Sequence, residues 1–222
     1  MATVVLSSLA MKGVLEKFRP DFEHVVGLLD LRFDATQAIL RRLAGGERAD
    51  FLVLTAEAMD ELRRQGRVTE ARAIGSSGVG VAVRAGAPRP DISSVQAFVR
   101  ALTAARSVAH SKVGASGIYF AQLLERFQIR LKKRLVIEKG PVGLAAASGE
   151  AEIAIQQLCE LAPVPGIDIV GPLPDPIQVM THFAAGVSAD AADPARALRL
   201  LELLRSPAAR EAMSRGGFHP AA

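Results

Sequence analysis

The stretch that decides the fold is Gly114-Ala115-Ser116-Gly117-Ile118-Tyr119. It follows residues 107–110, whose apolar character indicates a buried strand, and it opens the helically spaced run 118–127. Small residues and a hydroxyl at a strand-to-helix junction leave backbone N–H groups free, and the helix N-terminus adds partial positive charge. We therefore expect this junction to hold an anion, with Gly117 permitting close approach of the backbone.

A second junction of the same kind lies near the start of the chain, at Leu6-Ser7-Ser8-Leu9. It follows residues 3–6, which also indicate a buried strand. Two such junctions far apart in one chain predict a single ligand held between two lobes.

The first third of the chain alternates strands and helices. Strands are expected at 3–6, 25–33 and 51–54, and helices begin near residues 9, 36 and 56. Pro20 is expected to end the first helix, and Asp34 or Thr36 to cap the second. This alternation predicts a parallel sheet with helices on both faces.

The second part of the chain repeats the alternation with different spacing. Strands are expected at 78–83, 107–110, 135–137 and 151–155, helices at 94–105, 118–127, 141–149, 194–205 and 207–214, a loop at 163–176, and an extended segment at 179–187. We predict an α/β fold of two lobes, each a mostly parallel sheet flanked by helices, joined by two crossover strands. Lobe I is expected to comprise 1–78 and 184–222, and lobe II 79–183.

The composition argues against several classes of protein. The 222 residues include 27 Lys and Arg against 23 Asp and Glu, with no basic run beyond 132–134 and few aromatic residues, so nucleic acid is not an expected partner. No segment predicts membrane insertion, and no targeting segment is recognised, so we expect a periplasmic mature form or else a cytoplasmic protein. The single cysteine, Cys159, lies in an apolar setting that favours an inert buried thiol, and no cofactor or metal is expected.

Four motifs, taken in order, resemble the periplasmic molybdate-binding proteins among the type II periplasmic binding proteins. Val4-Val5-Leu6-Ser7-Ser8-Leu9 is similar to that family's first strand and turn, and 45–51 to its entry into the third strand. Ser116-Gly117-Ile118-Tyr119 is similar to its Ala-Gly-Ile-Tyr turn, and 204–218 to its closing segment. The resemblance covers nearly the whole chain.

The resemblance implies an oxyanion site at five positions of this chain. Two of them, Ser8 and Thr36, keep the hydroxyl of the family's first two contacts. The other three depart from the family's pattern, because Ser116, Gln156 and His182 stand where an alanine, an apolar residue and a tyrosine are usual. The remaining ligand-contact candidates are Ser7, Ser76, Ser77, Gly117, Ile118 and Tyr119.

The departures favour a larger and less symmetric anion than molybdate. Gln156 adds a donor and an acceptor to a site that otherwise needs neutral donors alone. A branch of the family contains aconitate isomerases, which resemble binding proteins yet move a double bond in a tricarboxylate. The segment 171–174 with Gln178, and the cluster Gln156-Gln157 with Glu160, resemble that branch.

Each candidate also has an ordinary structural role. Ser8 and Thr36 are suitable helix caps, and Gln156 is suitable as a buried side chain bound to the backbone. Ser76 and Ser77 are typical of a turn, and Tyr119 is suited to core packing.

Two functions remain open from the sequence. One is a solute-binding protein that captures a small oxyanion or carboxylate in an interlobe cleft for an ABC transporter permease, as an expected monomer. The other is an aconitate isomerase-like enzyme, which needs a general base, and His182 and Glu160 are the candidates. His182 has the alternative of a structural histidine, and Glu160 that of a surface carboxylate.

Overall fold

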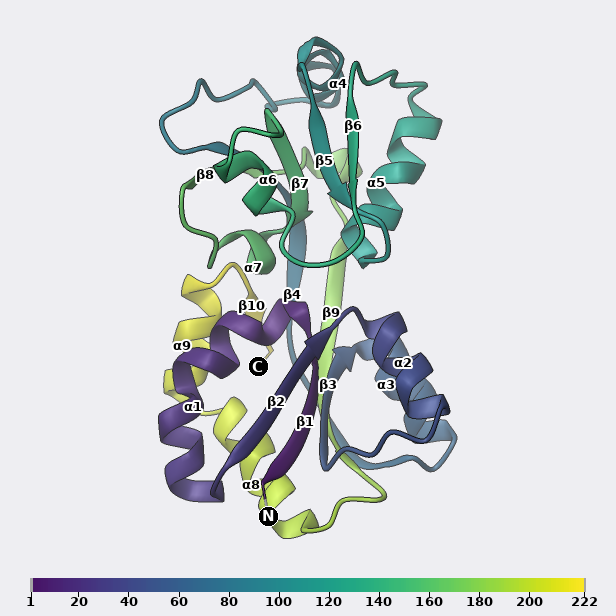
Figure 1. The fold of residues 1–222 in the computed structure, drawn as a ribbon, viewed down its shortest axis with the longest axis vertical. Helices are drawn as coiled ribbons and strands as arrows, with labels where there is room; N and C mark the ends of the chain where they lie inside the picture. The colour runs from purple at the N-terminus through teal and green to yellow at the C-terminus, as the bar shows by residue number, and fades with distance from the viewer. Residues whose placement is uncertain (1, 222) are drawn as a thin grey trace. The chain divides into compact units, whose positions relative to one another are not determined.

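The computed structural model describes residues 2–221 and divides the chain into two compact units. Unit 1 consists of Met1–Ser76 and Thr181–Ala222, and unit 2 of Ser77–Met180. Strand β4 (Val68–Arg84) leads the chain from unit 1 into unit 2, and strand β9 (Met180–Ser188) leads it back (Figure 1). The two units are described separately below.

Unit 1 is a mixed sheet with helices on both faces. Its other elements are β1 (Thr3–Ser8), a 3-10 helix (Leu9–Met11), α1 (Lys12–Val26), β2 (Leu29–Asp34), α2 (Thr36–Ala44), β3 (Phe51–Thr55), α3 (Ala56–Arg64), α8 (Pro194–Leu204), α9 (Pro207–Arg215) and β10 (His219–Pro220). The strand order is β2-β1-β3-β9-β4, with β10 paired to β4. Strands β2 and β3 run parallel to β1, and β9 runs antiparallel to β3. The carboxyl ends of β1, β2 and β3 therefore meet at one edge.

Alternating side chains fix the faces of this sheet. Leu6, Leu52 and Leu54 are buried against the apolar faces of α2 and α3. Helices α1, α8 and α9 lie on the other face, where α1 contacts both of the C-terminal helices (Figure 1). Because successive strand residues point to opposite faces, Ser7 and Ser8 at the end of β1 lie on opposite faces of the sheet.

The first helix is longer than the sequence predicted, because Pro20 lies inside α1 and does not end it. Apolar residues at positions 14, 18, 22 and 26 continue the helical spacing past the proline, and the rings of Phe18 and Phe22 stack 5.8 Å apart. Pro20 itself is exposed, so the missing N–H breaks no buried contact. As a result β2 begins at Leu29, four residues after the predicted start of that strand.

Unit 2 has a second sheet built on the same plan. Its elements besides β4 are α4 (Val95–Ala104), β5 (Val108–Ser111), α5 (Ala115–Arg126), β6 (Arg134–Ile137), α6 (Gly143–Ala147), β7 (Ile153–Gln157), α7 (Leu158–Leu161), β8 (Ile167–Pro172) and a 3-10 helix (Asp175–Ile177). The order is β4-β7-β5-β6, with β8 paired to β4. Strands β6 and β7 run parallel to β5, and β4 runs antiparallel to β7. The predicted loop 163–176 is therefore wrong in part, since it contains β8, whose pairing with β4 is irregular beside Val81.

The two faces of the unit 2 sheet carry different helices. Ile153 and Ile155 of β7 pack in the cluster that contains Phe98 of α4 and Phe120 of α5. Ala154 faces the other way, into a cluster with Ala145 and Ala146 of α6. By this alternation Gln156 lies on the α6 face of β7, and Gln157 lies on the face of α4 and α5.

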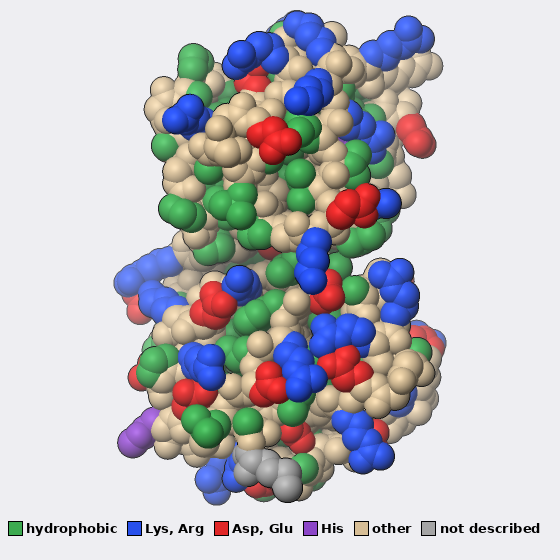
Figure 2. Space-filling view, in the orientation of Figure 1, with side chains coloured by type: hydrophobic (Ala, Val, Ile, Leu, Met, Phe, Trp, Pro, Cys, Tyr) green, Lys and Arg blue, Asp and Glu red, His purple; other side chains and the backbone are tan. Residues whose placement is uncertain are grey.

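The prediction of a mixed α/β fold with helices flanking the sheets is confirmed. On the face seen in Figure 2, Lys and Arg side chains are interspersed with Asp and Glu side chains rather than gathered in a stripe. Among the described residues, no helix is both long and apolar enough to span a membrane.

Candidate functional site

The carboxyl edge of unit 1 ends in two buried serines. Ser7 donates its hydroxyl to the backbone oxygen of Ser8 over 3.0 Å. Ser8 is only 5% exposed, and its Oγ has no hydrogen-bond partner among the described residues. Ser8 is the N-cap residue of the 3-10 helix, but its side chain makes no cap bond. Helix capping therefore does not account for its hydroxyl. A buried hydroxyl without a partner costs on the order of 1–3 kcal/mol and calls for an explanation.

The second junction of unit 1 lies beside the first. Asp34, the last residue of β2, pairs in register with Ser8. The expected cap by Asp34 or Thr36 is wrong, because Ala35 is the N-cap of α2 and no side chain caps it. The Asp34 carboxylate instead accepts from the N–H of Ala35 over 2.8 Å and lies 3.8 Å from Arg42. Thr36, partly buried, is the first residue of α2, so its hydroxyl lies next to the same edge.

The carboxyl edge of unit 2 includes the strand-to-helix junction at residues 114–119. Gly114 is the N-cap of α5 and has no side-chain cap bond, while its own N–H donates to Ser111 Oγ over 2.9 Å. Ser116 is buried in the first turn of α5. Gly117 has a packing role, because a Cβ there would come within 1.9 Å of the Ser111 backbone oxygen. The start of α5 therefore lies directly against the end of β5.

Four further ligand-contact candidates have the following surroundings. Tyr119 donates its hydroxyl to the backbone oxygen of Ile177 over 2.8 Å and packs against the core, while Ile118 is 46% exposed. Ser77 is buried and its Oγ accepts from the N–H of Cys159 over 3.1 Å. Ser76, the last residue of the first segment of unit 1, pairs in register with His219.

Gln156 lies at the end of β7 with its amide held in one orientation. It is 1% exposed, its Oε1 accepts from the N–H of Val142 over 2.8 Å, and its Nε2 donates to the carboxylate of Glu160. An amide held by a donor on one side and an acceptor on the other cannot flip without losing both bonds. The second N–H of Nε2 has no protein partner among the described residues.

Glu160 is the carboxylate that this amide holds. It lies in α7 and is partly buried, so the reading of a free surface carboxylate is wrong. Burial raises the pKa of Glu160 to about 7, and the hydrogen bond from Gln156 offsets part of that rise. A carboxyl group with such a pKa exchanges its proton near neutral pH, which is the property of a general acid or base.

His110 and His182 have different surroundings. His110, in β5, is buried; its Nδ1 is 2.8 Å from the Ser111 oxygen and its Nε2 accepts from Arg134 over 2.7 Å. Burial and the nearby guanidinium lower the pKa of His110, and both of its ring nitrogens have structural partners. His182 of β9 is exposed and makes no hydrogen bond within residues 2–221.

The thiol of Cys159 is unreactive. It is buried, and burial together with the nearby Glu160 raises the pKa of the thiol far above its ordinary range. No group of three His, Cys, Asp or Glu side chains within the described part of the chain is arranged to hold a metal ion.

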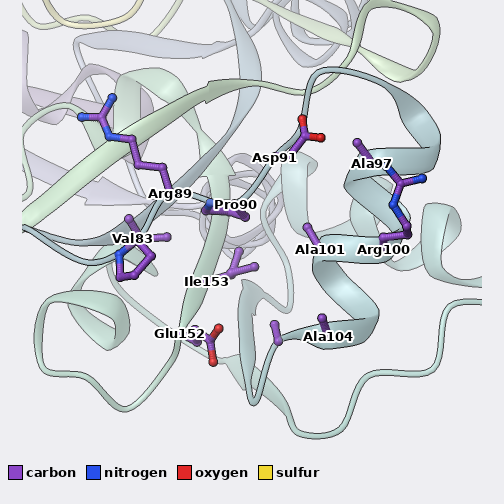
Figure 3. Close-up of a pocket in the computed structure, with 12 residues that line it drawn as sticks. Val83, Arg89, Pro90, Asp91, Ala97, Arg100, Ala101, Ala104, Glu152 and Ile153 are labelled. Carbon is purple, nitrogen blue, oxygen red and sulfur yellow. The ribbon is translucent and has the colours of Figure 1, made fainter.

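A cavity of about 350 Å³ lies at the other end of the unit 2 strands (Figure 3). It is lined by Arg89, Asp91, Arg100 and Glu152 together with prolines and small residues, and Arg89 and Arg100 lie on opposite sides of it in Figure 3. Glu152 is paired with Arg106 over 3.0 Å. None of the predicted ligand contacts lines this cavity, and its mixed charges do not favour an anion.

Two groups that shape the site have no recognisable pattern in the sequence. The N–H of Val142 orients Gln156, and the hydroxyl of Ser111 orients Gly114. Both are contacts between segments that the topology brings together, and neither residue type is distinctive at its position. The site candidates thus form one set at the carboxyl edge of unit 1 and another at the carboxyl edge of unit 2, which is where open α/β sheets bind ligands.

Residues 3–219 match the family described as bacterial extracellular solute-binding protein. The chain belongs to this family. An aconitate isomerase from Pseudomonas sp is 39% identical over 228 residues, which cover 97% of this chain and 87% of that protein. The periplasmic molybdate-binding protein of Azotobacter vinelandii has the same fold, with a TM-score of 0.78 at 17% identity over 99% of this chain and 100% of that one.

A sulfate-binding protein of Mycobacterium tuberculosis H37Rv is also similar in structure. Its TM-score is 0.73 at 17% identity, with 100% of this chain and 87% of that chain covered. These two structures, at such low identity, show the fold and leave the ligand open. The family assignment and the fold agree with the resemblance found in the sequence, namely a periplasmic binding protein of the molybdate-binding type with a likeness to aconitate isomerase.

Proposed function

We propose that this chain binds a small polycarboxylate anion, and that the ligand class is a tricarboxylate such as aconitate. The observation that carries the proposal is the Ser8 hydroxyl, which is buried at a carboxyl edge without a hydrogen-bond partner among the described residues. An anion oxygen would supply the missing acceptor. The other proposed contacts are Ser7, Thr36, Ser76, Ser77, Ser116, Gly117, Ile118, Gln156 and His182, whereas the Tyr119 hydroxyl donates to the Ile177 oxygen.

The groups of unit 2 favour a carboxylate over a metal oxyanion. A protonated Glu160 adds a donor that a symmetric tetrahedral ion does not need. A tricarboxylate is larger and carries oxygens in several directions. The spare N–H of Gln156 and a protonated Glu160 each suit one of these oxygens.

Calorimetry on the purified chain tests the proposal. Tricarballylate, cis-aconitate and trans-aconitate are titrated in parallel with molybdate and sulfate. We expect binding of the tricarboxylates and little or no heat with the tetrahedral ions. Binding of molybdate alone would show that the ligand is an oxyanion and not a tricarboxylate. If none of the five compounds gives heat, the proposal is wrong.

Isomerisation is a second candidate function, favoured by two observations. The carboxylate of Glu160 is held by Gln156 and titrates near neutral pH, and the relative at 39% identity is an aconitate isomerase. In this reaction the base removes one proton from the methylene carbon of trans-aconitate, the double bond shifts by one carbon, and a proton is returned to the former vinyl carbon. One C–H bond breaks and one forms, so no oxidant or reductant is required.

The choice of base follows from the surroundings of the two candidates. Burial gives Glu160 a pKa of about 7, which suits proton removal and return at neutral pH. His182 is exposed and lacks a partner among residues 2–221 that would orient its ring. We therefore assign the base to Glu160, with His182→Ala as the variant that tests the alternative.

Proton NMR of trans-aconitate incubated with the chain tests this second function. We expect cis-aconitate resonances to appear with the wild-type chain and with His182→Ala. If the wild-type chain binds both isomers and converts neither, the chain is a binding protein only. If His182→Ala alone loses conversion, the base assignment is wrong.

The remaining proposals concern the setting of the protein. Membership of the extracellular solute-binding family supports a periplasmic location and delivery of the ligand to an ABC transporter permease. We propose that the chain acts as a monomer and that the lobes are 1–78 with 184–222, and 79–183.

A further inference from the structure

A second buried donor at the carboxyl edge of unit 2 has no assigned role. Gln157 is the last residue of β7 and is 2% exposed. Its Nε2 has no hydrogen-bond partner among the described residues, and its Oε1 lies 3.9 Å from the Cys159 thiol, a weak donor. A buried amide with an unmet donor is rare in folded proteins, so a partner from outside the described residues is expected.

The register places Gln157 on the opposite face from Gln156. Gln157 pairs with Val79, and by alternation it shares the face of Ile153 and Ile155, which pack with Phe120 of α5. Gln156 is bound to Val142, on the α6 face. Gln157 therefore lies at the same edge and on the same face of the sheet as helix α5, whose first turn holds Ser116.

A third glutamine shows what a purely structural amide looks like in this unit. The Oε1 of Gln178 accepts from the N–H groups of Val79 and Val179 over 3.0 and 2.9 Å, and its Nε2 donates to the Val79 oxygen over 2.9 Å. Every bond of that amide goes to backbone. The Gln157 amide has none of these bonds. Gln157 is nevertheless more deeply buried than Gln178, and it also pairs with Val79.

We infer that Gln157 is a further ligand-binding residue, whose Nε2 donates to a carboxylate oxygen of the bound tricarboxylate. The inference rests on the proposed function for the identity of the ligand. It also implies that the two faces of β7 contribute different groups to the site. The α5 face supplies neutral donors from Gln157 and Ser116, and the α6 face supplies the Gln156–Glu160 pair.

The test compares Gln157→Met with Gln178→Met, using tricarballylate, which has no double bond to isomerise. Calorimetry gives the affinity, and thermal unfolding without ligand gives the stability. We expect Gln157→Met to keep or raise the melting temperature of the free protein, because it removes an unmet polar group, and to weaken binding roughly 10-fold to 100-fold. Gln178→Met is expected to lower the melting temperature and to leave the affinity nearly unchanged.

The outcomes separate this inference from the proposed function. If the wild-type chain binds tricarballylate and Gln157→Met binds it equally well, Gln157 is not a ligand contact while the proposed function stands. If the wild-type chain does not bind, both fall. Should Gln157→Met fail to fold, the side-chain amide signals of Gln157 in the ¹⁵N-labelled wild-type chain give the answer: a shift on addition of tricarballylate supports the contact, and no shift while other signals move overturns it.

Discussion

The carboxyl edges of the two units are built from different chemistry. In unit 1 the edge ends in the hydroxyls of Ser7, Ser8 and Thr36, and the Asp34 carboxylate is turned to the Ala35 N–H and to Arg42. In unit 2 the edge ends in the amide of Gln156, which holds the partly buried Glu160. One edge therefore offers neutral donors that suit any small anion, and the other offers a group that can exchange a proton.

This difference indicates that the two carboxyl edges have different roles in ligand binding. Hydroxyls at the end of a strand fit the oxyanion site that the molybdate-binding resemblance implies. Ser116 and Gln156 of unit 2 stand where that resemblance implies an alanine and an apolar residue. We therefore expect the unit 2 edge to determine which anion binds and whether a reaction follows, and the predictions below test this asymmetry.

The largest expected effect is on Glu160. Glu160→Gln keeps the acceptor for Gln156 but removes the titrating proton, so we expect the conversion of trans-aconitate to fall by roughly 100-fold to 10,000-fold. Affinity for tricarballylate is expected to change far less. Conversion is followed by proton NMR and affinity by calorimetry. Full activity of Glu160→Gln would show that the proton is carried elsewhere.

The next largest effect concerns the neighbouring serines of unit 1. Ser8→Ala removes a buried hydroxyl that has no described partner, so we expect about a 10-fold loss of tricarballylate affinity with no loss of melting temperature. Ser7→Ala is the matched control, because its hydroxyl already bonds the Ser8 oxygen, and it is expected to lower stability more than affinity. The reverse pattern would mean that Ser7, and not Ser8, is the principal contact.

A pH effect on stability is expected from Glu160. Its pKa is raised from 4.5 in the unfolded chain to about 7 in the folded one, so the folded state binds the proton more tightly. The resulting stabilisation is complete below pH 4.5 and is lost as the pH rises through 7. The melting temperature of the wild-type chain should therefore fall relative to that of Glu160→Gln between these values, measured by calorimetric scanning. A constant difference across this range would contradict the burial of Glu160.

The smallest effect is predicted for Tyr119. Its hydroxyl donates to the Ile177 oxygen, so Tyr119→Phe should cost about 1 kcal/mol of stability and leave affinity nearly unchanged. Thermal unfolding and calorimetry measure the two quantities. A loss of affinity without a loss of stability would place the hydroxyl on the ligand instead.

Much of the fold could be predicted because strand and helix periodicity is local. The runs at 3–6, 51–54 and 107–110 all correspond to strands of the structure. Pro20 was misjudged because the apolar spacing on its helix outweighs one missing hydrogen bond. The strand β8 was missed because its pairing with β4 depends on a partner about 85 residues away in the chain.

The junctions that carry the site candidates could be predicted from the sequence, but the surroundings of their side chains could not. The strand-to-helix junctions at Ser8 and Ser116 are visible in the sequence as small residues after apolar runs. The absence of a partner for the Ser8 hydroxyl, and the burial that raises the pKa of Glu160, arise from tertiary packing. No local pattern encodes either property.

The most direct test of the central claim is hydrogen exchange into the substrate. Wild-type chain and Glu160→Gln are each incubated with trans-aconitate in D₂O above pD 8, where Glu160 is ionised, and the methylene resonance is followed by NMR beside a protein-free control. We predict that the wild-type chain replaces methylene hydrogen with deuterium as cis-aconitate forms, and that Glu160→Gln binds the substrate with almost no exchange. Exchange at the same rate in both proteins, or none in the wild-type chain, would contradict the assignment of proton transfer to the unit 2 edge.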